Sequence, residues 1–403
     1  MQSMGLNLDK INFFKISQYK ANNKLILFGA GLVCKKFINN FDKSKILYII
    51  DNNESLWSTK FEGIEVKSPK KLKGLKNTEV IIMTTSFVDV IKQIKNINQT
   101  LSIKVSDYLK DLINIEILQS LKKKLLISSG LPTMSEKNSG GGLYEIDLQG
   151  LKWNLKKVYS GTVHGVIKID DEFAISDSTH GVILLDKNYK IKKKGKYPQN
   201  TRAHGITHDK KKNFFYVACS NTDKVKIFDG NLKFIDTISI SDKFEIYNSP
   251  QHHINDLCIV DQNLYVSMFS LSGNHKRNIY DGGVYEISLK TKKVKNKLYG
   301  NLTMPHSIKF IDENFTILDS LKGNLVIGNN ITSTFSGFSR GLSFDGTYYY
   351  IGQSRNRNFS LINASKDNIS IDNTILIYDK KNNISRNLFL PFGVSEIHEV
   401  LVI

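Results

Sequence analysis

The sequence predicts an α/β Rossmann-like N-terminal domain followed by an all-β six-bladed propeller. Over residues 22–110, apolar strand-like runs alternate with segments of helical period, which is typical of a parallel sheet with crossover helices. Beyond the helical stretch that ends this region, one unit of short strands recurs every 34–58 residues, which indicates propeller blades. We therefore expect a Rossmann-like nucleotide- or sugar-binding domain over residues 1–106, a helical connector over residues 107–122 and a propeller over residues 123–403.

The first apolar run, "KLILFGAG", ends in a turn that contains Gly29 and Gly31. Such a turn lets the backbone approach a phosphate at a helix N-terminus. Asp51 ends the second predicted strand, where an acid can hold ribose hydroxyls. We interpret these three residues as a site for a nucleotide or nucleotide-sugar. The full G-x-G-x-x-G pattern requires glycine where the chain has Cys34, so a purely structural domain is the alternative.

The segment "LILFGAG…IDNN…GIEVKSP" resembles the small nucleotide-sugar-binding domain at the N-terminus of bacterial sugar acyltransferases and other polysaccharide-biosynthesis enzymes. The resemblance covers about 90 residues and implies a nucleotide-sugar ligand. In those acyltransferases a left-handed parallel β-helix follows, and this chain has no such region. Acyl transfer is therefore not implied.

The repeated unit consists of a histidine or arginine, an apolar strand, a turn and a second apolar strand that ends in serine. Half a unit ends the chain, and its other half fits residues 123–130. The six resulting blades would close through the C-terminal strand, which removes the free edges of the sheets. The leading residues are His164, His204, His253, His306, Arg340 and His398, and the serines are Ser178, Ser220, Ser270, Ser320 and Ser354.

The first strand of a propeller blade lines the central channel, so the six leading residues are expected to surround one mouth of it. The loops after the second strands return to the same face. Four of the six arginines in the chain lie on this predicted face: Arg277, Arg340, Arg355 and Arg357. Guanidinium groups suit phosphate and carboxylate, so this placement favours an anionic ligand.

The channel imidazoles have three interpretations. They could coordinate a divalent metal on the axis, bind an anionic substrate together with the arginines, or lock one blade to the next. His253 is expected to face the axis instead of His252, because neighbouring strand residues point in opposite directions. Our candidates are His253, His306 and Arg340 for catalysis, His204, His253 and His306 for a metal, and His164, His204, Asn255, Arg277, Arg355 and Arg357 for the substrate.

The composition excludes several classes of protein. The net charge is +18, but 50 of the 56 basic residues are lysines spread along the chain, which predicts no specific nucleic-acid partner. No apolar run approaches the roughly 20 residues of a membrane helix, and the first residues lack a signal-peptide pattern. The three cysteines are few and widely spaced, so we expect a cytoplasmic protein.

The motifs "HINDL", "GGVYEI", "MPHS", "SRGLSF", "YIGQSR" and "GVSEIHEV" occur in an order that resembles a bacterial β-propeller family of uncharacterised function. Members of that family often occur alone or beside carbohydrate-related modules. The resemblance spans residues 123–403 and implies the propeller fold without implying a reaction.

Our leading hypothesis is a bacterial enzyme of surface-polysaccharide or nucleotide-sugar metabolism. It would act on an anionic sugar or nucleotide-sugar at the channel mouth, by elimination, isomerisation or transfer assisted by a divalent metal. The alternative is a non-catalytic propeller scaffold that binds a glycan or a partner protein. The reaction and the oligomeric state stay open.

Overall fold

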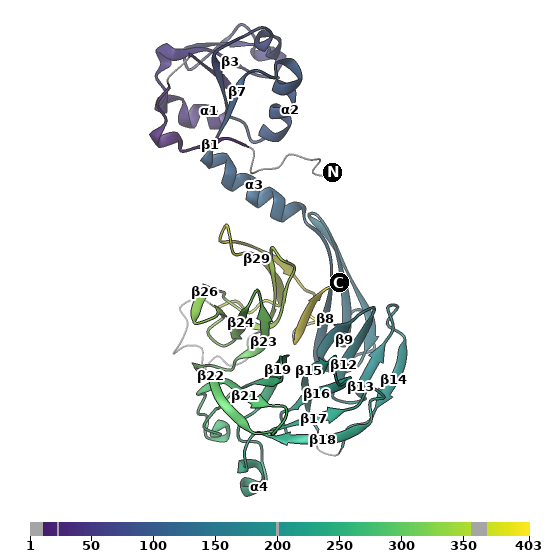
Figure 1. Ribbon diagram of the computed structural model, residues 1–403. Helices are drawn as coiled ribbons and strands as arrows, with labels where there is room; N and C mark the ends of the chain where they lie inside the picture. Colours follow the sequence, from purple (N-terminus) through teal and green to yellow (C-terminus); the bar gives the residue numbers. More distant parts are fainter. Residues whose placement is uncertain (1–10, 22–23, 199–200, 356–368) are drawn as a thin grey trace. The chain divides into compact units, whose positions relative to one another are not determined.

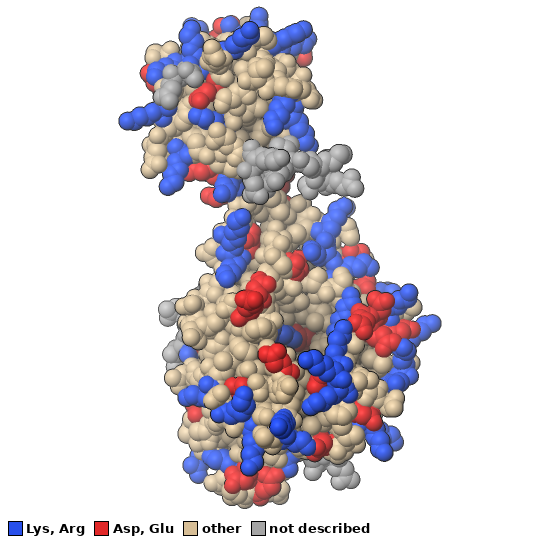
Figure 2. Space-filling model, viewed as in Figure 1, with Lys and Arg blue, Asp and Glu red and all other residues tan. Residues whose placement is uncertain are grey.

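The computed structural model describes residues 11–21, 24–198, 201–355 and 369–403. The chain divides into two compact units, Met1–Leu118 and Gln119–Ile403 (Figure 1). None of the described helices combines the length and the apolar character that crossing a membrane requires. On the face shown in Figure 2, basic and acidic side chains are intermingled and do not form a single basic patch.

Unit 1 contains a seven-stranded mixed sheet with a parallel centre. Its strand order is β1-β7-β6-β2-β3-β5-β4, and of these pairs only β4–β5 is antiparallel. The strands are β1 (Phe13–Phe14), β2 (Lys24–Phe28), β3 (Ile46–Ile50), β4 (Lys60–Phe61), β5 (Ile64–Lys67), β6 (Thr78–Ile82) and β7 (Ser102–Ser106).

Helices pack on both faces of this sheet, because alternate residues of each central strand point to opposite sides. Leu25 and Leu27 of β2 lie in the same hydrophobic cluster as Cys34 of α1, whereas Ile26 lies in a second cluster with Ile94 of α2. The helices are α1 (Leu32–Phe37), α2 (Phe87–Ile97) and α3 (Asp107–Ser120). The described unit is rich in short strands and 3-10 turns, and its sheet is mixed. It does not confirm the predicted Rossmann-like class.

The stretch predicted as a connector forms helix α3. Its residues Leu109 and Ile113 belong to the second cluster of unit 1, so the first part of this helix packs as part of that unit. The division between the two units falls near the end of the helix, after Leu118.

Unit 2 is a six-bladed β-propeller, as predicted, with six four-stranded antiparallel sheets. Blade 1 consists of β31 (Glu399–Val402), β8 (Lys122–Thr133), β9 (Gly140–Gln149) and β10 (Lys152–Ser160). Blade 2 consists of β11 (Val163–Ile169), β12 (Glu172–Asp177), β13 (Gly181–Leu185) and β14 (Ile191–Gly195). Blade 3 consists of β15 (Ala203–Asp209), β16 (Phe214–Cys219), β17 (Lys224–Phe228) and β18 (Phe234–Ser239).

The other three blades repeat this pattern. Blade 4 consists of β19 (Ile254–Val260), β20 (Asn263–Met268), β21 (Gly282–Ser288) and β22 (Val294–Leu302), and the short helix α4 (Lys243–Tyr247) precedes it. Blade 5 consists of β23 (His306–Ile311), β24 (Asn314–Asp319), β25 (Asn324–Ile327) and β26 (Asn330–Thr334). Blade 6 consists of β27 (Phe338–Phe344), β28 (Tyr349–Ser354), β29 (Thr374–Asp379) and β30 (Ile384–Phe389).

The C-terminal strand closes the propeller. β31 pairs antiparallel with β8, with Glu399 opposite Ser128 and Val402 opposite Leu125. The innermost strand of blade 1 therefore comes from the end of unit 2, and the other three strands come from its start. Hydrophobic clusters between neighbouring blades complete the packing, such as Val217 and Phe228 of blade 3 with Ala174 and Val182 of blade 2.

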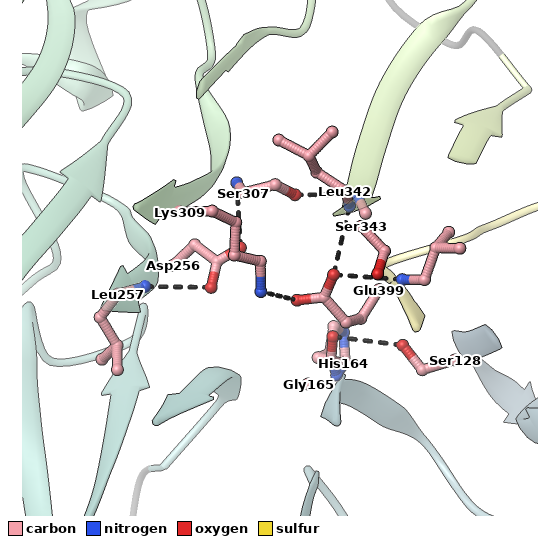
Figure 3. Close-up of polar contacts among 12 residues, drawn as sticks. Ser128, His164, Gly165, Asp256, Leu257, Ser307, Lys309, Leu342, Ser343 and Glu399 are labelled. Atoms are coloured by element: carbon pink, nitrogen blue, oxygen red, sulfur yellow. Dashed lines mark hydrogen bonds and ion pairs between the residues drawn. The ribbon is translucent and has the colours of Figure 1, made fainter. Parts of the chain in front are cut away.

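The innermost strands are also linked by polar side chains that bond to the backbone of the next blade (Figure 3). The carboxylate of Asp256 accepts a hydrogen bond from Ser307 N at 2.9 Å, and Ser307 Oγ accepts one from Gly341 N at 2.8 Å. Glu399 Oε1 accepts one from Leu342 N at 3.2 Å. These bonds connect blades 4, 5, 6 and 1 in order around the channel.

Candidate functional site

All six predicted leading residues lie at the start of an innermost strand and meet around one end of the channel. We call these residues the channel ring: His164, His204, His253, His306, Arg340 and His398. Five of them are buried, and His253 is partly buried.

One half of the channel ring is a continuous row of imidazoles. The centroids of His164 and His398 are 4.3 Å apart, those of His164 and His204 are 4.7 Å apart, and those of His204 and His253 are 5.8 Å apart. Arg340 continues the row beyond His398, since its Nη1 lies 3.3 Å from His398 Nε2.

Two phenylalanines, which were not among the predicted site residues, complete the other half of the channel ring. Phe269 stacks on His253 with centroids 4.4 Å apart and contacts His306 at 5.3 Å. Phe338 lies between His306, at 5.7 Å, and the Arg340 guanidinium, at 5.3 Å. Both residues stand directly before a polar residue at a strand end, in "MFS" and "FSR", and that position was the signal available in the sequence.

Hydrogen bonds fix the tautomers of two channel imidazoles. Ser320 Oγ and the carbonyl of Met304 lie 2.8 and 3.0 Å from His306 Nδ1. A carbonyl only accepts, so Nδ1 carries the proton and Nε2 has the lone pair. Ser178 plays the same part for His164, because its hydroxyl donates to Ala203 O and its oxygen is left to accept from His164 Nδ1 at 3.0 Å.

The imidazoles of the channel ring are neutral. Burial is the main cause, and it lowers the pKa of His164 and of His253 to about 3. It also holds the pKa values of His204, His306 and His398 well below their usual range. The positive charges of Arg202 and Arg340 act in the same direction. Arg202, two residues before His204, was missed in the sequence analysis although it is one of only six arginines.

Neutral imidazoles with a lone pair on Nε2 have a restricted chemistry. They can coordinate a metal or accept a hydrogen bond from a hydroxyl group, but they cannot donate to an anion through that nitrogen. The guanidinium of Arg340 supplies the donors and the positive charge of the channel ring. The site therefore combines hydrogen-bond acceptors, the Nε2 atoms of the imidazoles, with the positive charge of the Arg340 guanidinium.

The histidines that the structure brings to metal-ligand spacing differ from the predicted set. Among the described residues, His164, His204 and His398 can place one ligand atom each within 4.8 Å of one another. The predicted set shared only His204 with this group. His253 is turned toward Phe269 and His306 is held on the opposite side of the channel ring by Ser320.

His252 and His253 point in different directions, as predicted, but strand alternation is not the cause, because both residues precede β19 and His253 has a φ of +53°. His252 Nδ1 bonds to the carbonyl of Ser270 at 2.8 Å and its Nε2 lies 2.8 Å from Ser241 Oγ, so both nitrogens have a partner away from the channel. His253 instead joins the row of imidazoles.

Several residues predicted to bind substrate have other surroundings. The side chain of Asn255 links two blades, because it donates to Pro305 O at 2.7 Å and accepts from Ser267 Oγ at 2.6 Å. Arg277 is exposed in the short 3-10 helix η7 (His275–Arg277). The guanidinium of Arg355 lies 4.1 Å from the centroid of Phe392. Arg357 lies outside the described residues.

In unit 1, the residues predicted to bind a nucleotide contact one another and the neighbouring backbone. Gly29 has a φ of +114°, and a Cβ there would come within 2.9 Å of Met83 O, so this position requires glycine. Gly31 precedes α1, which has only six residues. Asp51 Oδ2 accepts from Ala30 N at 2.7 Å and Oδ1 from Asn53 N at 2.8 Å. The carboxylate thus closes the turn, and its role toward a ribose stays a prediction.

A second polar cluster lies on the innermost strands of unit 2 (Figure 3). It consists of Asp256 on β19, Lys309 on β23 and Glu399 on β31, and Lys309 Nζ lies 2.7 Å from Glu399 Oε2. Burial raises the pKa of Asp256 to about 7, against the opposing effect of Lys309. The two carboxylates in turn hold the pKa of Lys309 above its usual value although burial opposes them.

Comparisons with protein families give two matches. Residues 147–403 match a family described as "Domain of unknown function (DUF4915)", and residues 21–104 match one described as "C2185-like, N-terminal". The first match covers more than half of the chain. Neither description names a sugar acyltransferase, so that resemblance stays a prediction. No curated protein matches the chain.

Solved structures that resemble the chain are distant. A nidogen/laminin complex has 10% identity and a TM-score of 0.49 and covers 70% of this chain and 98% of its own. The computationally designed Ika8 protein has 11% identity and a TM-score of 0.38, with 68% and 90% covered. Hydrazine synthase of Kuenenia stuttgartiensis has 13% identity and a TM-score of 0.38, with 65% and 96% covered. At these TM-scores the likenesses carry no argument about the chain.

Proposed function

This chain belongs to the DUF4915 family, and we propose that its propeller binds a small anionic compound rich in hydroxyl groups at the channel ring and acts on it by proton transfer. An anionic sugar, free or as a nucleotide-sugar, is the leading candidate. The proposal is carried by one observation: neutral imidazoles with Nε2 lone pairs share a closed ring with the guanidinium of Arg340.

The anionic group and the hydroxyl groups of such a ligand suit the guanidinium and the imidazoles of the channel ring. A carboxylate or phosphate pairs with a guanidinium through charge-assisted hydrogen bonds, which are about twice as strong as neutral ones. A hydroxyl group of the same ligand then donates to Nε2 of His306, whose Nδ1 proton is already engaged. A neutral sugar would leave the guanidinium without an anion, and a simple anion would leave the lone pairs without donors.

The anion also prepares the imidazoles for proton transfer. A negative charge beside an imidazole favours its protonated form, so binding raises the pKa of His306, which burial and Arg340 lower. An imidazole whose pKa rises toward neutrality can exchange protons with the ligand as a general acid or base. Elimination and isomerisation next to a carboxylate both begin with such a transfer.

Calorimetry with a hexuronate, a hexose phosphate, a UDP-hexuronate and a neutral hexose tests this proposal. The anionic sugars are expected to bind with uptake of protons, which is measured by repeating the titration in buffers of different ionisation enthalpy. Arg340→Met should weaken binding on the order of 10- to 100-fold, because it removes a charge-assisted pair of about 1.5–3 kcal/mol. Arg340→Lys keeps the charge and should recover part of the affinity.

Lys210→Met is the matched control, since it removes a positive charge that is 73% exposed and that follows β15 at the end away from His204. We expect it to change the affinity less than twofold. Equal binding of the neutral hexose, or full affinity in Arg340→Met, would disprove the proposal. Product formation followed by NMR in the same samples separates an enzyme from the scaffold alternative.

A further inference from the structure

Three histidines of the channel ring come from three neighbouring blades and gather around one point. His164 is on β11, His204 is on β15, and His398 directly precedes β31. One ligand nitrogen of each lies within 4.8 Å of the other two, and all three side chains are buried. A tetrahedral zinc ion with three histidine ligands requires nitrogens about 3.4 Å apart, so small side-chain rotations would complete the site.

His204 provides an independent sign that a ligand is bound here. Its Nε2 is buried and has no hydrogen-bond partner among the described residues, although the residue is only 5% exposed. A buried polar atom without a hydrogen-bond partner destabilises the folded chain. A metal ion bound to this nitrogen would remove that cost.

Gly130 on β8 packs directly against the other two imidazoles. A Cβ at this position would come within 2.5 Å of His398 Nε2 and 2.7 Å of His164 Nε2. Gly130 has no positive φ, so its backbone does not require glycine. Glycine is instead required because the two imidazole nitrogens already fill the place of a side chain.

The neighbours of the three imidazoles suit metal binding as well. Ser178 bonds to Nδ1 of His164 and leaves Nε2 as the coordinating nitrogen, and metal-bound histidines commonly have such a hydrogen-bond partner on their other nitrogen. Glu396 Oε2 lies 3.5 Å from His398 Nε2 and supplies a negative charge nearby. Arg340 Nη1 lies 3.3 Å from the same nitrogen, so a metal ion at His398 has to replace this hydrogen bond.

We propose that His164, His204 and His398 bind one divalent first-row metal ion, with Zn²⁺ as the best fit to three neutral imidazoles. A fourth ligand position would remain for the anionic group of the ligand. This last point rests on the proposed function, whereas metal binding by the three histidines does not.

The test is metal analysis of the full-length chain, purified without a histidine tag and reconstituted with Zn²⁺. We expect about one equivalent of tightly held Zn²⁺ and, with Co²⁺ in its place, the strong visible absorption of a tetrahedral site. His164→Gln and His204→Gln should each weaken metal binding at least 100-fold. Gly130→Ala should also prevent binding, although it removes no ligand, because its methyl group would displace the two imidazole nitrogens.

Two controls match these variants. His208→Gln changes a histidine at the far end of β15, and Gly300→Ala adds a Cβ whose nearest neighbour is 3.5 Å away. Both are expected to bind metal as the parent chain does. Circular dichroism identifies any variant that fails to fold. If a histidine variant fails to fold, Gly130→Ala still tests the site.

The outcomes separate this inference from the proposed function. If the parent chain holds no metal, or if the His164→Gln/His204→Gln double variant still holds it, the inference is wrong. If a hexuronate binds equally well in EDTA while no metal is found, the proposed function stands without the metal. If one equivalent of metal binds at these histidines but no anionic sugar does, the metal site stands and the proposed function fails.

Discussion

Unit 2 is expected to unfold on mild acidification, between about pH 6.5 and about pH 5. The five imidazoles of the channel ring are neutral in the folded chain, because their pKa values are lowered by burial and by neighbouring positive charge. In the unfolded chain each imidazole has a pKa of about 6.5. The unfolded state therefore binds more protons below this pH, and the free energy of unfolding falls as the pH falls.

The size of the effect follows from the same linkage. At pH 5 each imidazole that stays neutral in the folded chain costs about 2 kcal/mol of stability relative to pH above 7. Five imidazoles give about 10 kcal/mol, which is comparable to the whole stability of a typical domain. Asp256 acts in the opposite direction, since its raised pKa means that the folded state takes up a proton first. One carboxyl group does not balance five imidazoles.

Urea unfolding measured by tryptophan fluorescence across this pH range checks the prediction. The chain has two tryptophans, Trp57 in unit 1 and Trp153 in unit 2, so a Trp57→Phe background reports on unit 2 alone. EDTA in all samples removes any contribution from a competing metal. His306→Gln should lower the slope of stability against pH by about one fifth, and His208→Gln should not change it. A flat profile between pH 7 and pH 5 would contradict the prediction.

The position of the channel ring could be predicted from the sequence because every blade repeats the same register. A histidine or arginine at the head of each innermost strand necessarily lies at the same end of the channel. His398 could be included because the C-terminal half unit lacks its partner strands, which fixes its place in blade 1.

The contacts across the channel could not be predicted in this way, because they depend on side-chain rotamers and on residues from different blades. The predicted metal set left out His164 and His398, whose imidazoles are the closest pair in the ring. In the sequence, Phe269 and Phe338 look like ordinary core residues. The cluster of Asp256, Lys309 and Glu399 joins residues up to 143 positions apart, and no local pattern connects them.

The second prediction with a large expected effect concerns this cluster. Lys309→Met should lower the free energy of unfolding of unit 2 by about 3 kcal/mol, the lower end of the range for a buried ion pair. The Lys309 side chain is 23% exposed, but its removal leaves the buried carboxylate of Glu399 uncompensated. Glu399 is 3% exposed and Asp256 is 7% exposed, so neither carboxylate can recover its solvation without opening the blades. Lys309 itself is on the innermost strand of blade 5, and its loss would weaken the contact between that strand and the closing strand β31.

The double variant Lys309→Met/Glu399→Gln distinguishes loss of charge balance from loss of packing. It should regain most of the lost stability, because neutral replacements for a buried ion pair are often close to neutral in energy, and Asp256 can take a proton near pH 7. The surface pair Lys210–Asp170 provides the matched control, with side chains 73% and 78% exposed. Lys210→Met should change stability by less than about 1 kcal/mol. If Lys309→Met behaves like Lys210→Met in urea unfolding followed by Trp153, the cluster does not stabilise the closed propeller, and its three charges must be solvated through the channel.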